Sequence, residues 1–360
     1  MKRNSCIRYS ELVAKLFEAL MSREDEICKY LSDRSLAAKF IRFLREARVF
    51  SATIKLCNNE LMRQYRNEIC NQVAYKDIIS ELLFIRERER IPFVFVKTVT
   101  PFSYDRTDID IFIMDKLYVA DIVNVLCHRY GFKLVTVGTP AIVLRKIVDN
   151  IIVYVDLHWK LSAGTFEYVN TPKLIQRRKD RIKDEDSAIN TILIFGHAYL
   201  KDLGMSLGRL FYLIVIMASL TTEDLKDIVI SSIDAAFDIV MPLGLIQIIE
   251  FIRLMKPYLV SNQTRRLVTS ALKNAYIMLK LLNNYSLVFS LRHPLLSIVR
   301  RAIRKSFVEA EIKLNGMIRI PFYASILLYL IIIKKNITVY RRITVSYTHL
   351  RAHETEADLV

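Results

Sequence analysis

The chain has 360 residues, 52% of them hydrophobic and 25% charged, and this composition excludes an intrinsically disordered protein. Its 53 Lys and Arg against 37 Asp and Glu give a formal net charge of +16. Such a charge is typical of proteins that bind nucleic acid, nucleotides or anionic membranes, and equally of a basic surface without a partner. With only 8 Gly and 8 Pro, few tight turns and mostly long, regular elements are expected.

The N-terminal region, 1–90, has the apolar periodicity of helices. Ser10 is a suitable N-cap for a first stripe of apolar residues at helical spacing, and a second such stripe follows Ser35. A third helix is predicted over 76–90 and is stopped by Pro92.

The next region, 91–165, has the character of a small sheet. β-branched and aromatic runs predict five strands, with one helix between the second and the third. The predicted strands are 93–96, 108–114, 133–137, 141–147 and 151–157, and the helix covers 116–130 with Gly131 as its C-terminal cap. This order predicts a compact α/β core.

A second helical region is predicted over 166–344. Acidic residues at 184–186 favour a helix start, and Thr221 with Asp224 has the spacing of a capping box. The longest uncharged apolar run, 320–333, has 14 residues, which is shorter than the roughly 20 needed to cross a bilayer. We therefore expect a buried helix there and no transmembrane segment. The fold class is predicted to be α+β, a small mixed-sheet core flanked by helical regions.

The last residues, 345–360, resemble translated sequencing-adapter read-through. We therefore expect a non-native tail that carries no information about the fold.

Cysteine usage is sparse. The five cysteines are odd in number and include no CxxC pair, so neither a disulfide framework nor a zinc site is expected: Cys6, Cys28, Cys57, Cys70 and Cys127. A reducing compartment, and hence a cytoplasmic location, is predicted from this pattern.

Three carboxylates form the candidate catalytic and metal site. Asp108 and Asp110 are two residues apart on one strand, so both project from the same face, about 6.5–7 Å apart at their backbones. Such a pair alone is more often a solvated turn. Asp156, however, lies within another apolar strand, where a lone charge is costly. Three converging carboxylates are suited to Mg²⁺, with Mn²⁺ as an alternative, holding nucleotide phosphates.

The motif Asp108-Ile-Asp110-Ile, preceded by Val96-Lys97-Thr98 and followed by Tyr154-Val-Asp156-Leu-His158-Trp159, resembles the nucleotidyltransferase superfamily that includes DNA polymerase beta. The similarity covers 93–162 and is greatest to an uncharacterised microbial branch. It implies transfer of a nucleoside monophosphate from an NTP, such as ATP, to an acceptor, with release of pyrophosphate. In the family the first two acids bind both metals and the triphosphate, and the third completes the site nearer the attacking group.

Lys97 and Thr98 stand where many members of the family have Gly-Ser. Glycine allows close approach of the backbone to phosphate, whereas here the Lys97 ammonium and the Thr98 hydroxyl would have to bind it. Lys97 is equally well explained as a surface lysine. Three further residues are candidate nucleotide contacts because they lie in the loop before the acids or on the neighbouring strand: Tyr104, Arg106 and Arg145.

Two histidines receive different interpretations. His158 shares a strand face with Asp156 and is either a ligand or base or a structural histidine, whereas His197 lies on a predicted helix and is assigned no chemistry.

The main alternative is a degenerate nucleotidyltransferase fold that binds nucleic acid as a scaffold. Basic clusters at 177–181 and 300–305 would form its surface. A membrane-surface protein is disfavoured because 320–333 is apolar all round. The acceptor, whether RNA, protein or small molecule, is left open by the sequence.

Overall fold

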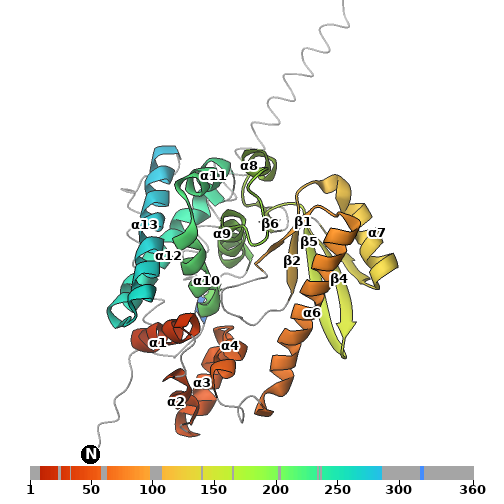
Figure 1. Cartoon of the computed structure of the whole chain (residues 1–360). Coiled ribbons are helices and arrows are strands. Elements are labelled where there is room, and N and C mark those ends of the chain that lie inside the picture. Colours follow the sequence, from red (N-terminus) through yellow and green to blue (C-terminus); the bar gives the residue numbers. More distant parts are fainter. Residues whose placement is uncertain are drawn as a thin grey trace, which may run out of the picture. The chain divides into compact units, whose positions relative to one another are not determined.

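The fold is α+β, as the sequence predicts, with a five-stranded mixed sheet, helices packed on that sheet, and further helices near both ends of the described chain (Figure 1). Two compact units divide the chain at residue 320. The computed structural model describes residues 9–22, 26–32, 34–57, 63–97, 108–138, 141–163, 166–201, 204–232, 235, 237–285 and 317–319, all within the first unit. The predicted helix at 320–333 and the tail at 345–360 lie outside these residues.

The N-terminal helices form where apolar residues repeat at helical spacing. They are α1 (Tyr9–Ser22), η1 (Glu26–Cys28), α2 (Lys29–Ser32), α3 (Arg34–Glu46) and α4 (Phe50–Leu56). The buried side of α1 packs against the C-terminal helices, where the ring centroids of Phe17 and Phe211 lie 4.9 Å apart. The Glu18 carboxylate also accepts the N–H groups of Val260 and Ser261, at 2.6 and 2.7 Å.

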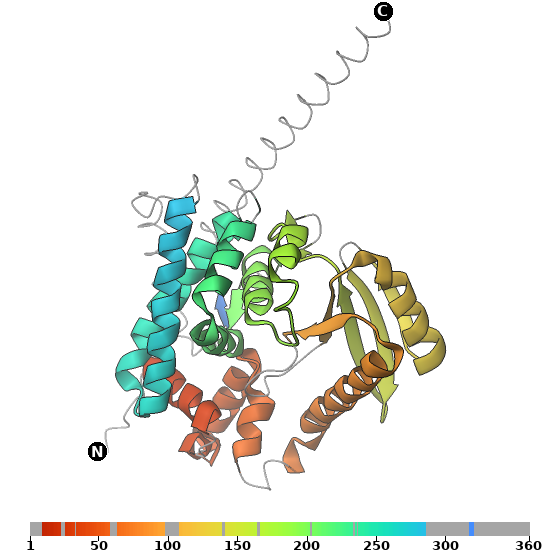
Figure 2. The same ribbon diagram turned by 45° about the horizontal axis from the view of Figure 1, so that its top comes forward.

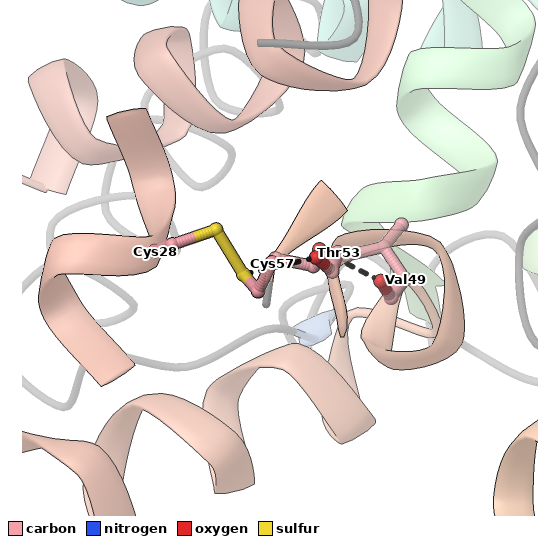
Figure 3. Close-up of a disulfide and its surroundings, with 4 residues drawn as sticks. All are labelled: Cys28, Val49, Thr53 and Cys57. Carbon is pink, nitrogen blue, oxygen red and sulfur yellow. Dashed lines mark hydrogen bonds between the residues drawn. A yellow bond between two sulfur atoms is a disulfide. The ribbon is translucent and has the colours of Figure 1, made fainter. Parts of the chain in front are cut away.

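A disulfide joins Cys28, at the end of η1, to Cys57, which follows α4 (Figure 3). The prediction that the chain has no disulfide is therefore wrong. The two residues are 29 positions apart, and only the packing of η1 against α4 brings their Cα atoms to 5.5 Å. Among the described residues, Cys70 and Cys127 are free thiols. Since disulfides are uncommon in reducing compartments, the cysteines no longer support the predicted cytoplasmic location.

The five main strands are β1 (Phe93–Val96), β2 (Ile109–Ile113), β3 (Lys133–Val137), β4 (Ala141–Val148) and β5 (Ile151–His158). Their order is β1-β2-β5-β4-β3, and all neighbours are antiparallel except β2 and β5. The predicted strand positions are confirmed to within two residues. The single parallel pair sets the beginning of β2 beside the end of β5.

Two helices bury one face of this sheet: α6 (Arg66–Glu89), which begins well before the predicted position 76, and α7 (Val119–Tyr130), which follows η2 (Lys116–Tyr118). Together with alternate strand residues such as Ile111 and Val155 they form one apolar core. Gly131 caps α7 as predicted, with a left-handed φ of 71° that costs glycine little.

The C-terminal helices are α8 (Thr171–Arg178), α9 (Ser187–Gly196), η3 (His197–Lys201), α10 (Leu207–Ser219), α11 (Thr222–Ser232), α12 (Phe237–Met255), η4 (Lys256–Tyr258) and α13 (Asn262–Tyr285) (Figure 2). Two short hairpins accompany them, β6 (Ser162–Ala163) with β7 (Phe166–Glu167) and β8 (Gly204–Ser206) with β9 (Met317–Arg319).

Capping residues set the starts of two of these helices. The Asp186 carboxylate accepts the N–H groups of Ala188 and Ile189 at the start of α9. Thr221 and Asp224 bond each other reciprocally at the start of α11, which confirms the predicted capping box.

A buried arginine joins three segments of this region. The Arg178 guanidinium, 3% exposed, pairs with Asp186, Asp224 and Asp227, the first at 2.8 Å. Because the three acids come from the N-cap of α9 and from α11, this cluster ties α8 to both helices.

Within the ranges given above, no helix combines the length and the apolar character that crossing a membrane requires.

Candidate metal centre

Two neighbouring strands carry the predicted acids to the same place on the sheet. Asp110, near the start of β2, is in register with Asp156, near the end of β5. Residues in register on adjacent strands project from the same face, here the face opposite α6 and α7. His158 is two residues beyond Asp156 and therefore also lies on that face, as predicted.

Asp110 is the centre of the contacts. Its side chain is buried, and its two oxygens have different partners: Oδ1 lies 2.8 Å from His158 Nε2 and Oδ2 lies 3.0 Å from Lys97 Nζ. Lys97 is not a surface lysine, because only 10% of its side chain is exposed. The ammonium therefore neutralises the buried carboxylate.

Asp110, Asp156 and His158 form the one group of possible metal ligands among the described residues. One donor atom from each lies within 4.8 Å of the others. Two carboxylates with one imidazole are a donor set that Mn²⁺ and Mg²⁺ accept, and the imidazole also suits Zn²⁺. Within the described part of the chain, His158 Nδ1 is buried with no hydrogen-bond partner, so among these residues the ring is held through Nε2.

The two carboxyl groups have opposite pKa shifts. Burial disfavours the charge on Asp110, but the Lys97 ammonium and the hydrogen bond from His158 outweigh it and hold its pKa well below the usual range. Burial, followed by the negative charges of Asp110 and Asp108, raises the pKa of Asp156 to about 6. The site thus contains one carboxylate that a cation neutralises and one whose charge is unfavourable.

Asp108 lies next to this group but is not a member of it. It precedes β2 by one residue and is half-buried, and its charge contributes to the raised pKa of Asp156. The structure thus brings Asp110 and Asp156 together with His158, while the carboxylate of Asp108 stays outside the 4.8 Å set.

Lys97 follows β1 with a backbone conformation that favours glycine. Its φ is +54°, in the left-handed region where a non-glycine residue is strained. Its N–H donates to Asn190 Oδ1 at 2.8 Å, and the Asn190 amide donates in turn to Glu185 and to Tyr212. A fully buried asparagine on α9 therefore holds the turn that directs Lys97 toward Asp110.

Two contributors were not found from the sequence. Asn190 lies in α9 next to apolar residues such as Ile189 and Ile192, and a polar residue in such surroundings indicates a buried hydrogen-bonding role. His197, in the π-helical turn η3, is buried near Asp110 and helps to lower its pKa. No local pattern marks His197, because it reaches the site only through the packing of a distant helix.

The remaining predicted residues have mixed outcomes. Arg145 is exposed on β4 and pairs with Tyr154 of β5. Tyr154 lies two residues before Asp156 on the same strand, so Arg145 and Asp156 project from the same face of the sheet. Three others lie outside the described residues: Thr98, Tyr104 and Arg106.

Comparison with known proteins gave no match to any family model, curated protein or solved structure.

Proposed function

We propose that this chain is a divalent-metal-dependent nucleotidyltransferase that moves a nucleoside monophosphate from an NTP to an acceptor hydroxyl. The observation that supports this most is the register of Asp110 with Asp156 on parallel strands, with His158 completing a group of donors within 4.8 Å. The resemblance of 93–162 to the nucleotidyltransferase superfamily supports the same function.

In this proposal Asp110 and Asp156 hold Mg²⁺, or Mn²⁺, with Asp108 beside them. The unfavourable charge of Asp156 fits a cation site, because a bound cation would stabilise the ionised carboxylate. When bound, the metal would supply charge stabilisation for the triphosphate and the leaving pyrophosphate. His158 would orient Asp110 through its Nε2 hydrogen bond.

The proposed reaction replaces one phosphorus–oxygen bond by another. The acceptor oxygen bonds to the α-phosphorus of the NTP, and the bond between that phosphorus and the oxygen bridging to the β-phosphate breaks. The proton of the acceptor hydroxyl passes to water. Pyrophosphate leaves. Among the described residues, Lys97 is well placed to bind a phosphate oxygen, since its ammonium already lies beside Asp110. Thr98, Tyr104, Arg106 and Arg145 are the further proposed nucleotide contacts.

A second candidate, a non-catalytic nucleotidyltransferase fold that binds nucleic acid, is favoured by one observation. Both oxygens of Asp110 already have partners, Lys97 and His158, so the lysine ammonium occupies a position that a metal would take. An Asp110 carboxylate that its own lysine neutralises needs no metal to be stable.

Calorimetry with ATP, with and without Mg²⁺ or Mn²⁺, distinguishes the two candidates. We expect wild-type binding only with the divalent ion, and at least about tenfold weaker metal-dependent binding in Asp110→Asn and Asp156→Asn. Asp121→Asn, an exposed aspartate on α7, is the matched control and should bind as the wild type does. If the wild type binds neither ATP nor any other NTP with either ion, the proposed nucleotidyl transfer is overturned and the non-catalytic candidate is favoured.

Incubation with each labelled NTP then tests the reaction itself. Label would be scored on RNA, on protein and on small molecules, because the acceptor decides which of these becomes labelled.

A further inference from the structure

The sheet face that carries Asp110 is covered over only part of its area. On β1 and β2 it is buried, as the side chains of Val94, Val96 and Phe112 show. Toward the start of β5 the same face is open, because Ile152 is 42% exposed and Tyr154 is 37% exposed. The candidate metal centre therefore lies at the boundary between a covered and an uncovered part of one surface.

The register defines this uncovered part, which we call the open strip. Its residues pair in rows across β4 and β5: Ile147 with Ile152, then Arg145 with Tyr154, then Val143 with Asp156. Lys133 of the edge strand β3 extends the middle row, because it pairs with Arg145. The strip thus leads from an apolar end, through an aromatic and cationic row, directly to an acid of the candidate centre.

Arg145 and Lys133, the cations of the open strip, differ from the neighbouring Lys146 in the sheet face that they occupy and in their ion pairing. Lys146, one position after Arg145, projects from the opposite face and forms an ion pair with Glu81. Arg145 and Lys133 are both exposed, and within the described part of the chain no ion pair involves either of them. Their charges are therefore available to an anionic ligand.

We propose that the open strip binds a single-stranded nucleic acid and delivers its terminal hydroxyl to the candidate metal centre. Tyr154 offers a ring on which an unpaired base stacks, and Ile147 and Ile152 extend that apolar surface. Arg145 and Lys133, which follow Tyr154 in the same row, bind the phosphates of the nucleotides beside that base. The acceptor role rests on the proposed nucleotidyl transfer, whereas the binding itself does not.

The chemistry of the open strip disfavours a second copy of this chain as its ligand. In a two-fold symmetric contact the same patch meets itself, so Arg145 and Lys133 would face their own copies. Like charges at such a contact repel. A duplex is also disfavoured, because its paired bases leave no free face for Tyr154.

Fluorescence anisotropy with a labelled 12-nucleotide single-stranded RNA, and with the matching DNA, tests this proposal on the full chain in EDTA. Tyr154→Ser should weaken binding at least about fivefold, through loss of stacking. Arg145→Gln should weaken it and lower the slope of log affinity against log salt by about 0.7. The controls are Lys146→Gln, on the same strand but the opposite face, and Tyr118→Ser, an exposed tyrosine elsewhere. Both should bind as the wild type does.

Three results would overturn the proposal: no binding of either oligonucleotide, equal weakening by the control variants, or sedimentation showing a wild-type dimer that Tyr154→Ser dissociates. Mn²⁺ and ATP binding to the wild type and to Tyr154→Ser separates this test from the proposed function; Arg145→Gln is left out because Arg145 is also a proposed ATP contact. Tyr154→Ser should keep its Mn²⁺ affinity. Normal ATP binding with no RNA or DNA binding overturns the open strip alone. Normal oligonucleotide binding with no ATP binding overturns the proposed function and the acceptor role together.

Discussion

Two buried charged clusters in this protein use the same kinds of residue in opposite ways. In the helical cluster around Arg178, a guanidinium bonds Asp186, Asp224 and Asp227, and Arg177 and Arg181 add further positive charge at Asp227. In the candidate metal centre, the Lys97 ammonium pairs with Asp110, while Asp156 and the neighbouring Asp108 add further negative charge. The first cluster is balanced by its own cations and the second is not.

The pKa shifts express this difference. Burial opposes the charge on Asp224, but hydrogen bonds from Arg178 and Thr221 lower its pKa nevertheless. For Asp156 nothing comparable offsets burial and the neighbouring acids, so its pKa rises to about 6. Buried acids with fixed cationic partners are typical of structural ion pairs, whereas an acid left unbalanced indicates a site that can take a ligand.

The largest effect is expected where the balanced cluster is broken. Arg178→Met leaves three buried or half-buried carboxylates without their common partner, and removing one member of a buried pair typically costs about 3–5 kcal/mol. Urea unfolding should show a loss of this size. Arg178→Lys, which keeps the charge but not the forked geometry, should lie between it and the wild type. A loss below about 1 kcal/mol would contradict the structural role of the cluster.

In the unbalanced cluster, removing a charge should stabilise the protein. The unfolded Asp156 ionises near pH 4, while the folded one retains its proton to about pH 6, so its contribution to stability falls as the pH rises through this window. Asp156→Asn should therefore match the wild type near pH 4 and exceed its free energy of unfolding by up to about 3 kcal/mol near pH 7.

Urea titrations in EDTA across pH 4–8 measure this difference, with Asp121→Asn as the control that should show no such pH dependence. Parallel curves for the wild type and Asp156→Asn would mean that the charge of Asp156 is not unfavourable. Added Mn²⁺ should stabilise the wild type more than the variant.

Lys97 supplies the ammonium that pairs with Asp110 in the candidate metal centre. Removing it should therefore increase the excess of negative charge there and the difference from the Arg178 cluster. Lys97→Met leaves Asp110 without its ammonium partner and should raise Mn²⁺ affinity about tenfold, as measured by paramagnetic resonance. The same change should weaken metal-dependent ATP binding by about 1–3 kcal/mol, if the ammonium also binds phosphate. Lys146→Met, which breaks an ion pair on the other face, is the matched control. Unchanged Mn²⁺ affinity would show that Lys97 does not compete with the metal.

The smallest effect is expected at the rim of the balanced cluster. Arg181 is 38% exposed and contacts Asp227 and Glu223 from the surface. Arg181→Gln should reduce the free energy of unfolding by no more than about 1 kcal/mol, because solvent screens exposed pairs. The reduction should shrink further in 0.5 M salt. A loss as large as that of Arg178→Met would place the centre of the cluster at Arg181 instead.

The sequence by itself determined the elements and their faces. Alternation in 109–113 and 151–158 is a local property of extended backbone, and it sufficed to put Asp110 on one face of its strand and Asp156 with His158 on one face of theirs. Capping chemistry was equally local, as Gly131 and the Thr221–Asp224 box show.

The tertiary structure alone decided which faces meet. The register of β2 with β5, the ion pair from Lys97, the support from Asn190 and the approach of His197 each join segments far apart in the chain. The same is true of the disulfide between Cys28 and Cys57, which the cysteine spacing did not indicate. The periodicity of a segment predicts which of its residues are buried. These contacts depend instead on which distant segments pack together, and no local pattern encodes that choice.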